Sequence, residues 1–203
     1  MYKLVGRKGS GSIGPHFVLE ELGVPYAFTH VEKEHLASPE YLLLNPMGRV
    51  PALILPSGEA MFESAAMVAY LGAAHPSALS PKPGTLAHAR FSQWLVFLSA
   101  NVYETYLRFF YSDRYTADGE KGAAQVKAQA GKDLEKQFSI LENALSPNLA
   151  GAELTLADHY LYMLATWWDP SPDALYGKHP KIAALAKRLE ARPAVAKVLK
   201  ENA

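Results

Sequence analysis

The stretch that decides the fold of this 203-residue chain is Gly48-Arg49-Val50-Pro51-Ala52-Leu53. A run of β-prone residues begins at Ala52, and a proline stands directly before it. A β-branched residue followed by proline at a strand entrance suits a cis peptide bond, although trans is the commoner state of such a pair. In the cis state the N–H and C=O of Val50 would turn outward, where they can pair with the backbone of an extended peptide. The hexapeptide therefore indicates a strand entrance with room for a peptide beside it.

Short elements of alternating type surround this stretch within the first 76 residues. Glycines, prolines and serines mark their ends, and a Pro-Ser-Gly-Glu turn over 56–59 is of the kind that joins antiparallel strands. The expected strands cover residues 2–5, 26–31, 52–55 and 60–62. The expected helices cover residues 13–22, with Ser12 as N-cap and Gly23 as stop, 39–44 and 63–74. The order is strand–helix–strand, then a helix, then strand–strand–helix.

A proline-rich stretch separates this region from a helical one. Prolines at this spacing favour a linker over a regular element, so we expect a first domain over 1–76, a linker over 77–84 and a second domain over 85–203. In the second domain, apolar residues recur at spacings of three and four positions, as one face of a helix requires. The first face carries Phe91, Trp94, Leu95, Leu98 and Val102, and the second carries Val126, Ala130, Leu134, Phe138, Leu141 and Leu145. Further helices are expected after Thr155, which caps with Asp158, and over 180–189 and 193–199.

Composition excludes several classes of function. Lysine plus arginine total 20 and aspartate plus glutamate total 20, so the formal net charge is zero. Nucleic acids and anionic membranes attract basic proteins, so we expect neither as a partner. The chain has no cysteine, which excludes disulfides, cysteine-ligated metals and a catalytic thiol of its own, and its histidines show no metal-ligand spacing. The polar N-terminus and the absence of a long apolar run favour a cytoplasmic protein.

One motif points to a different function. The segment over 9–14 spells G-x-G-x-x-G after a strand and before a helix, which is the local pattern of dinucleotide binding, and Glu32 lies near the distance of a ribose contact. A dinucleotide fold needs further alternating strand–helix units, whereas this chain continues with a hairpin and then helices. We therefore interpret the glycines as residues that allow the backbone to make a tight turn.

The pair Glu63-Ser64 stands where the last expected strand gives way to a helix. A helix N-terminus offers free N–H groups and a partial positive charge, which suit a small carboxylate. Ser64 adds a hydroxyl donor and Glu63 can accept from an ammonium group, so the pair is equipped to hold an amino-acid zwitterion. An ordinary N-cap pair has the same sequence signature.

Together these segments resemble the cytosolic glutathione transferases, of a bacterial and serine-type rather than cysteine-type form. Residues 45–53 are similar to that family's cis-proline loop, 63–71 to its γ-glutamyl-binding helix and 154–158 to the helix start of its second domain. Arg192-Pro193 falls where many members have such a pair. The resemblance implies an α/β thioredoxin-like N-terminal domain, βαβ-α-ββα with a mixed four-stranded sheet, followed by an all-α helical-bundle C-terminal domain.

The resemblance also implies residue roles, with glutathione as co-substrate and no permanently bound cofactor. Glu63 and Ser64 would hold the γ-glutamyl end of the tripeptide, and Val50 would pair with its cysteinyl backbone. Pro51 would fix that geometry, and Arg49 would assist the glycyl end.

The residue that activates the thiol comes, in this family, from the loop after the first strand. Members use tyrosine, serine or cysteine there, but Tyr2 lies inside the expected strand and the chain has no cysteine. Ser10 aligns best with the serine of serine-type members, and Ser12 aligns with a second serine that often lies beside the sulfur. Gly11 stands where bacterial cysteine-type members place their cysteine. Both serines remain candidates, and turn or cap chemistry is the alternative for each.

The second substrate would be a small hydrophobic electrophile in a cleft between the domains. Candidate pocket residues on the first helix of the second domain are Tyr103, Tyr106, Arg108 and Phe110. Tyr103 lies roughly where cysteine-type members carry a histidine. Core packing with a dimer interface explains these aromatics equally well.

Two functions follow from the resemblance. The first is a glutathione transferase that adds the thiolate of glutathione to an electrophile or reduces a peroxide. The second is a catalytically weak binding or regulatory protein that keeps the same scaffold. In either case the resemblance implies a homodimer.

Overall fold

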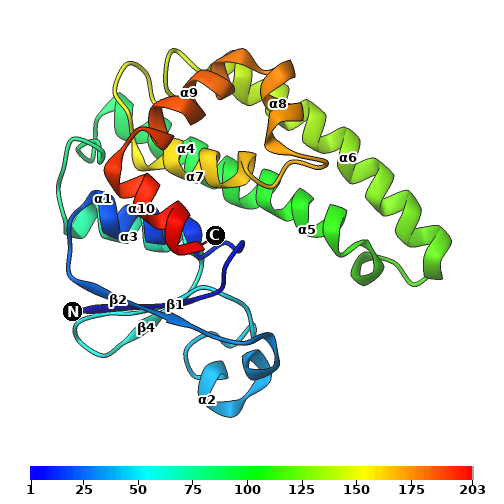
Figure 1. The fold of residues 1–203 in the computed structure, drawn as a ribbon, viewed down its shortest axis with the longest axis horizontal. Helices are drawn as coiled ribbons and strands as arrows, with labels where there is room; N and C mark the ends of the chain where they lie inside the picture. The colour runs from blue at the N-terminus through cyan, green and yellow to red at the C-terminus, as the bar shows by residue number, and fades with distance from the viewer. Residues whose placement is uncertain (203) are drawn as a thin grey trace. The chain divides into compact units, whose positions relative to one another are not determined.

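The computed structural model describes residues Met1–Asn202, which form two compact units (Figure 1). The first unit contains Met1–Lys82 together with the residues from Ala186 onward, and the second contains Pro83–Leu185. The C-terminal residues belong to the first unit because helix α10 (Pro193–Asn202) packs on helix α1 (Ile13–Glu21). We expected independently folding domains on either side of a linker at residues 77–84, and that expectation stays a prediction.

A mixed four-stranded sheet lies at the centre of the first unit. Its strands are β1 (Tyr2–Gly6), β2 (Tyr26–His30), β3 (Ala52–Ile54) and β4 (Ala60–Met61). Their order across the sheet is β2-β1-β3-β4, with β1 parallel to β2 and β3 antiparallel to both of its neighbours. The expected sheet is confirmed, and each strand ends within one residue of its predicted limit.

Both faces of the sheet are covered. Helices α1 and α3 (Ser64–Ala74) pack against each other on one face (Figure 1), and Leu4 and Leu53 of the sheet are fully buried. The connection from β2 to β3 contains a 3₁₀ turn, η1 (Lys33–Ala37), and the short helix α2 (Pro39–Leu42). Tyr41 of α2 forms a buried cluster with Val5 and Ala52. Because successive strand residues point to opposite faces, this cluster covers the face away from Leu4 and Leu53.

The start of α1 differs from the expectation. Ser12 occupies the N-cap position, but its backbone is helical and its side chain makes no capping hydrogen bond. The hydroxyl is bonded instead to the backbone of Arg7, so the expectation that Ser12 caps the helix is wrong. The other end agrees with the sequence, since Gly23 adopts the left-handed conformation that terminates helices, with φ of 62°.

The second unit is helical. Helix α4 (Leu86–Phe97), the π-helical stretch η2 (Leu98–Tyr103) and α5 (Glu104–Phe110) follow one another without a break, and α6 (Gly119–Ala144) packs along α5. The remaining elements are the 3₁₀ turn η3 (Ser112–Tyr115), α7 (Leu156–Ala165), α8 (Pro172–Lys178) and α9 (Pro180–Glu190), which continues into the first unit. The all-helical expectation for this region is confirmed, although α8 was not predicted.

Helix α7 forms the buried centre of the second unit, with all ten of its residues buried. It begins with the predicted capping box, in which the Asp158 carboxylate accepts from the Thr155 N–H at 2.7 Å and from the Leu149 N–H at 2.8 Å. Burial raises the pKa of Asp158 against these hydrogen bonds, which lower it. Across residues 1–202, none of the helices combines the length and the apolar character that a membrane crossing requires.

Candidate functional site

Three segments meet at one end of the sheet, and the strand register shows why. Val5 pairs with Ala52 in antiparallel strands, so the end of β1 adjoins the start of β3. Leu53 pairs with Met61, also antiparallel, so β4 ends on this side too. The loop after β1, the residues before β3 and the residues after β4 therefore share this end of the sheet. Seven predicted site residues belong to these segments: Ser10, Ser12, Arg49, Val50, Pro51, Glu63 and Ser64.

The two candidate serines form one hydrogen-bonded pair. Their hydroxyl oxygens are 2.8 Å apart, and both lie within hydrogen-bond distance of the Arg7 carbonyl oxygen, Ser10 at 2.7 Å and Ser12 at 2.9 Å. Ser12 also accepts from the Arg7 N–H at 3.2 Å and is fully buried, whereas Ser10 is half-buried. Ser10 is therefore the more accessible of the two hydroxyls.

Gly6 makes this arrangement possible. A Cβ atom on Gly6 would lie 2.4 Å from the Ser12 Cβ and 2.5 Å from its hydroxyl oxygen, far closer than atoms can approach. Only glycine at the end of β1 lets the serine loop fold back this closely.

The Val50–Pro51 peptide bond is cis, as the sequence suggested. Val50 is half-buried against the cluster around Tyr41, while Pro51 is buried. Within residues 1–202 neither the N–H nor the C=O of Val50 has a hydrogen-bond partner. Both groups are therefore free to pair with another backbone, and the Arg49 side chain beside them is exposed.

Two residues that the sequence reasoning did not assign hold this loop in place. The Asn45 side-chain amide donates to the Arg49 carbonyl at 2.6 Å and to the Pro51 carbonyl at 3.3 Å, and its oxygen accepts from the Met47 N–H at 3.0 Å. The Tyr41 hydroxyl also donates to the Arg49 carbonyl, at 2.7 Å, and burial raises its pKa to about 12. An asparagine before proline, just upstream of the Val-Pro pair, was the available signal for Asn45.

Glu63 stands at the N-cap of α3 in a strained conformation. Its φ of 71° and ψ of 101° make it the sole non-glycine residue with positive φ in residues 1–202. Such a conformation costs about 1–3 kcal/mol and tends to occur at functional sites. The Glu63 carboxylate is exposed and has no partner within the described chain, while Ser64 beside it is 8% exposed.

Two helix N-termini add positive potential at this end of the sheet. Helix α1 follows the serine loop, and α3 follows Glu63. Each terminus carries about half a positive charge from the helix dipole, which favours anions. The site thus offers one free carboxylate, two anion-favouring helix ends and one free backbone edge.

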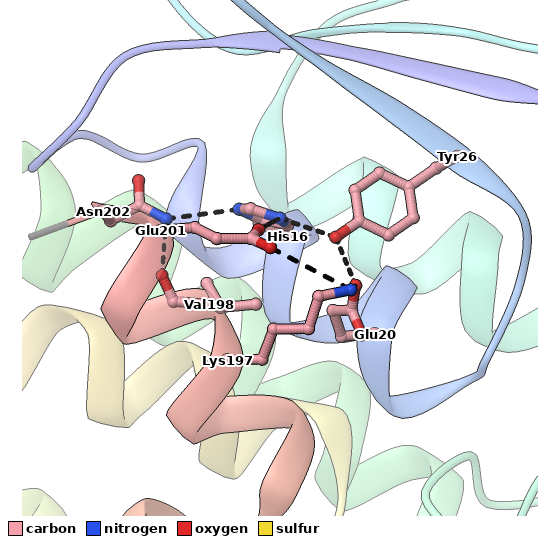
Figure 2. A network of polar contacts seen from close by, with 7 residues as sticks. All are labelled: His16, Glu20, Tyr26, Lys197, Val198, Glu201 and Asn202. Carbon is pink, nitrogen blue, oxygen red and sulfur yellow. Dashed lines mark hydrogen bonds and ion pairs between the residues drawn. The ribbon is translucent and has the colours of Figure 1, made fainter.

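A polar network around the buried His16 side chain connects α1 with β2 and with α10 (Figure 2). The Tyr26 hydroxyl donates to Glu20 at 2.5 Å, so it accepts from the Nε2 of His16 at 2.8 Å. The other ring nitrogen of His16, Nδ1, is 3.3 Å from the Asn202 amide nitrogen, and the ring stacks on Phe28. These contacts fit a neutral His16 with its proton on Nε2.

Charged residues of α10 complete this network. Lys197 pairs with Glu20, and Glu201 lies 3.3 Å from the His16 Nε2. Burial lowers the pKa of His16, and this outweighs the carboxylates of Glu201 and Glu20, which raise it. Arg192 adds a two-pronged ion pair to Glu21 of α1, at 2.5 Å and 2.6 Å.

The four residues predicted to contact an electrophile all lie in the second unit. Tyr106 stacks on Phe110, with ring centroids 5.8 Å apart, while Tyr103 packs edge-on against Trp167. Arg108 donates to the Thr105 hydroxyl at 3.0 Å. Phe110 is 49% exposed, whereas Tyr106 is 1% exposed and burial raises the pKa of its unpartnered hydroxyl far above the usual value. The structure brings Tyr106 and Phe110 together and gives Tyr103 and Arg108 other partners.

Comparison with known proteins decides the family. Residues 12–74 match the model of the glutathione S-transferase N-terminal domain, and residues 101–202 match that of the glutathione S-transferase C-terminal domain. The chain belongs to the glutathione S-transferase family. The resemblance drawn from the Val-Pro loop and the Glu-Ser helix start is thereby confirmed.

Relatives within the glutathione S-transferase family match at least 95% of the chain. The uncharacterised GST-like protein YncG of Escherichia coli K12 is 31% identical, over 100% of this chain and 98% of its own. Glutathione S-transferase GstA of Escherichia coli O157:H7 is 28% identical, over 95% and 94%. A Sulfitobacter glutathione transferase homologue with bound glutathione has a TM-score of 0.88 at 26% identity, over 99% and 98%. A sphingomonad glutathione S-transferase complexed with glutathione has a TM-score of 0.83 at 29% identity, over 98% of each chain.

Proposed function

We propose that the chain is a glutathione transferase that binds glutathione at the shared end of the sheet and activates its thiol there. The observation that carries the proposal is the strained Glu63, whose free carboxylate stands at the N-terminus of α3. A residue held at a cost of about 1–3 kcal/mol needs a compensating use, and an amino-acid zwitterion provides one. Relatives crystallised with glutathione support the choice of tripeptide.

Each part of glutathione has a counterpart among the polar groups of the site. The Glu63 carboxylate accepts from the ammonium of the γ-glutamyl group, while Ser64 and the N-terminus of α3 take its carboxylate. The N–H and C=O of Val50 pair with the cysteinyl backbone, in the geometry that Pro51 fixes. Arg49, exposed beside them, takes the glycyl carboxylate.

We assign thiol activation to Ser10 rather than Ser12. A free thiol has a pKa near ~8.5, and each unit of lowering corresponds to about 1.4 kcal/mol. Ser10 can turn its proton from the Arg7 carbonyl to the sulfur, because Ser12 still donates to that carbonyl. Together with the N-terminus of α1, this hydrogen bond favours the thiolate.

The ionised sulfur then attacks the electrophile. A carbon–sulfur bond forms with the electron pair of the thiolate, and the leaving group departs with the pair of the bond that breaks. We assign the pocket of a small hydrophobic electrophile to Tyr103, Tyr106, Arg108 and Phe110. A peroxide substrate would instead be reduced to an alcohol and water, while two molecules of glutathione are oxidised to their disulfide. A homodimer, to be tested by sedimentation, and a cytoplasmic location are part of the same proposal.

A second candidate function is a glutathione-binding protein with weak catalysis. The observation that favours it is that both serine hydroxyls already have partners inside the loop. Passage over immobilised glutathione, followed by an assay with an activated aryl chloride, separates the two. Retention with turnover supports the transferase, and retention without turnover supports the binding protein. Failure to bind the resin or free glutathione would contradict both.

A further inference from the structure

The buried side chain of Asn45 is bonded to the backbone on both sides of Val50. Asn45 is 4% exposed. Its amide nitrogen donates to the carbonyl oxygens of Arg49 and Pro51, while its amide oxygen accepts from the Met47 N–H. Because donor and acceptor contacts are both made, only one orientation of the amide fits the loop. A single side chain therefore holds the two carbonyl groups that flank Val50.

The contact with the Arg49 carbonyl determines where the Val50 N–H points. That carbonyl and that N–H belong to one trans peptide unit, which is planar, so they point in opposite directions. The carbonyl accepts from Asn45 at 2.6 Å and from Tyr41 at 2.7 Å, which uses both of its lone pairs. Since the carbonyl is directed toward two buried side chains, the N–H of Val50 is directed away from them.

The contact with the Pro51 carbonyl holds the chain on the other side of Val50. This carbonyl belongs to the peptide unit that leads into β3, and it accepts from Asn45 at 3.3 Å. Strand β3 is fixed in turn by the pairing of Ala52 with β1. Asn45 thus connects the peptide units before and after Val50, whereas Tyr41 reaches only the first of them. The N–H and C=O of Val50 itself have no hydrogen-bond partner within residues 1–202.

We propose that Asn45 is a positioning residue, which directs the Val50 N–H so that it donates to the cysteinyl carbonyl of glutathione. The inference rests on the proposed function, because it concerns the same tripeptide, and it adds a buried residue that acts on the ligand through the backbone. In an Asn45→Ala variant the Arg49 carbonyl keeps only the Tyr41 hydroxyl, and the Pro51 carbonyl loses its side-chain partner. The peptide unit can then rotate, and the hydrogen bond from its N–H to the ligand is weakened.

The test compares two probes that differ only in the carboxamide that contains this carbonyl. γ-Glutamylcysteinamide has the carboxamide, and γ-glutamylcysteamine has a hydrogen atom in its place. Titration calorimetry with each probe gives the ratio of the two dissociation constants, and a loss of affinity common to both probes leaves that ratio unchanged. We expect the unaltered protein to prefer the cysteinamide by at least about fivefold, and Asn45→Ala to reduce this preference to about twofold or less.

Asn148→Ala is the matched control. Asn148 is also 4% exposed and donates to a loop carbonyl, that of Ala152, at 2.7 Å, but it lies in the second unit. Its loss should leave the preference within about twofold of the value for the unaltered protein. If Asn45→Ala does not fold, as judged by circular dichroism, Tyr41→Phe takes its place. This variant removes one of the two donors to the Arg49 carbonyl and keeps the ring in its buried cluster, so the preference should fall at least about twofold.

The outcomes separate this inference from the proposed function. If the unaltered protein binds glutathione but shows no preference for the cysteinamide, or if the folded variant keeps that preference, the positioning role of Asn45 is overturned. An equal fall in Asn148→Ala would also overturn it, because the effect would then follow from any lost loop contact. If the unaltered protein binds neither glutathione nor the two probes, the proposed function itself fails, and this inference fails with it.

Discussion

At the scale of single residues, the proposed site depends on Glu63 and on a pair of serines. Glu63 has positive φ without being glycine, so its position gains nothing for local stability. Its value must lie in where the carboxylate is held, at the first turn of α3 and free of any partner in the described chain. Charge and backbone strain can be separated by two substitutions.

Glu63→Gln keeps the strain and removes the charge, whereas Glu63→Gly removes both. We expect both variants to lose glutathione affinity by about tenfold or more, since a charged hydrogen bond contributes about 1.5–3 kcal/mol. Unfolding by urea should show the glycine variant at least as stable as the unaltered protein, because relief of about 1–3 kcal/mol outweighs the added chain entropy. A glycine variant clearly less stable than the glutamine variant would contradict the strain argument.

Ser10→Ala should lower turnover with little change in glutathione affinity. Loss of one hydrogen bond to the sulfur that raises the thiol pKa by about one unit would reduce turnover about tenfold near neutral pH. Steady-state kinetics with saturating electrophile measures this. Ser12→Ala is the control, because its hydroxyl is buried against Arg7 and its loss should lower stability first. Unchanged turnover in Ser10→Ala would transfer activation to Ser12 or to backbone N–H groups.

The role of Ser12 could not be predicted from the sequence. A serine before a helix is the ordinary sign of an N-cap, and the sequence was interpreted that way. The structure differs because Gly6, six positions earlier, leaves no side chain in the space that the Ser12 side chain occupies. In contrast, the cis bond between Val50 and Pro51 and the place of Glu63 at a helix start could be predicted, because each stands at a strand or helix boundary with a distinctive residue type.

At the scale of elements, α10 holds α1 through the network around His16. Tyr26 and Glu20 approach His16 from β2 and α1, and Glu201 and Lys197 approach it from α10. The contact joins residues more than 170 positions apart, so no local pattern in the sequence predicts it. The loop to which we assign thiol activation precedes α1, so this network supports the proposed site.

The network predicts a pH dependence of stability. Because folding lowers the pKa of His16, the unfolded chain binds its proton more readily, and stability falls as pH drops below the unfolded value of about 6.5. The His16→Gln variant lacks this contribution. The difference in the free energy of unfolding between the unaltered protein and the variant should therefore shrink as the pH is lowered from 8 to 5. Urea unfolding at several pH values measures it, with proton NMR titration of His16 as a check. An advantage that grows on acidification would contradict the assignment.

Other elements differ in how clearly the sequence marks them. The Thr155–Asp158 capping box and the Pro-Ser-Gly-Glu turn have strong local signatures, and both were predicted. Helix α8 was missed because it is short and buries only Leu175. The π-helical stretch over Leu98–Tyr103 was also missed, since its buried residues Leu98 and Val102 keep an ordinary helical spacing of four.

At the scale of the whole molecule, the order of elements was predictable and the assignment of the C-terminal residues was not. Two sequence patterns predicted the fold. They are the short alternating strands and helices of the first unit and the spacing of apolar residues by three and four positions in the second. The residues from Ala186 onward join the first unit through α10, whose own sequence is that of any amphipathic helix. The match of both domain models places the chain in its family, and the thiol-activating step remains the claim to be tested.

The most direct test is a pH titration of protein-bound glutathione, in which the ultraviolet absorbance of the thiolate is measured at each pH. The account predicts that bound glutathione ionises at least about one pH unit below the ~8.5 of a free thiol, and that Ser10→Ala moves this midpoint back upward. Thiolate absorbance that appears only at the pH of free glutathione, with protein in excess, would contradict it.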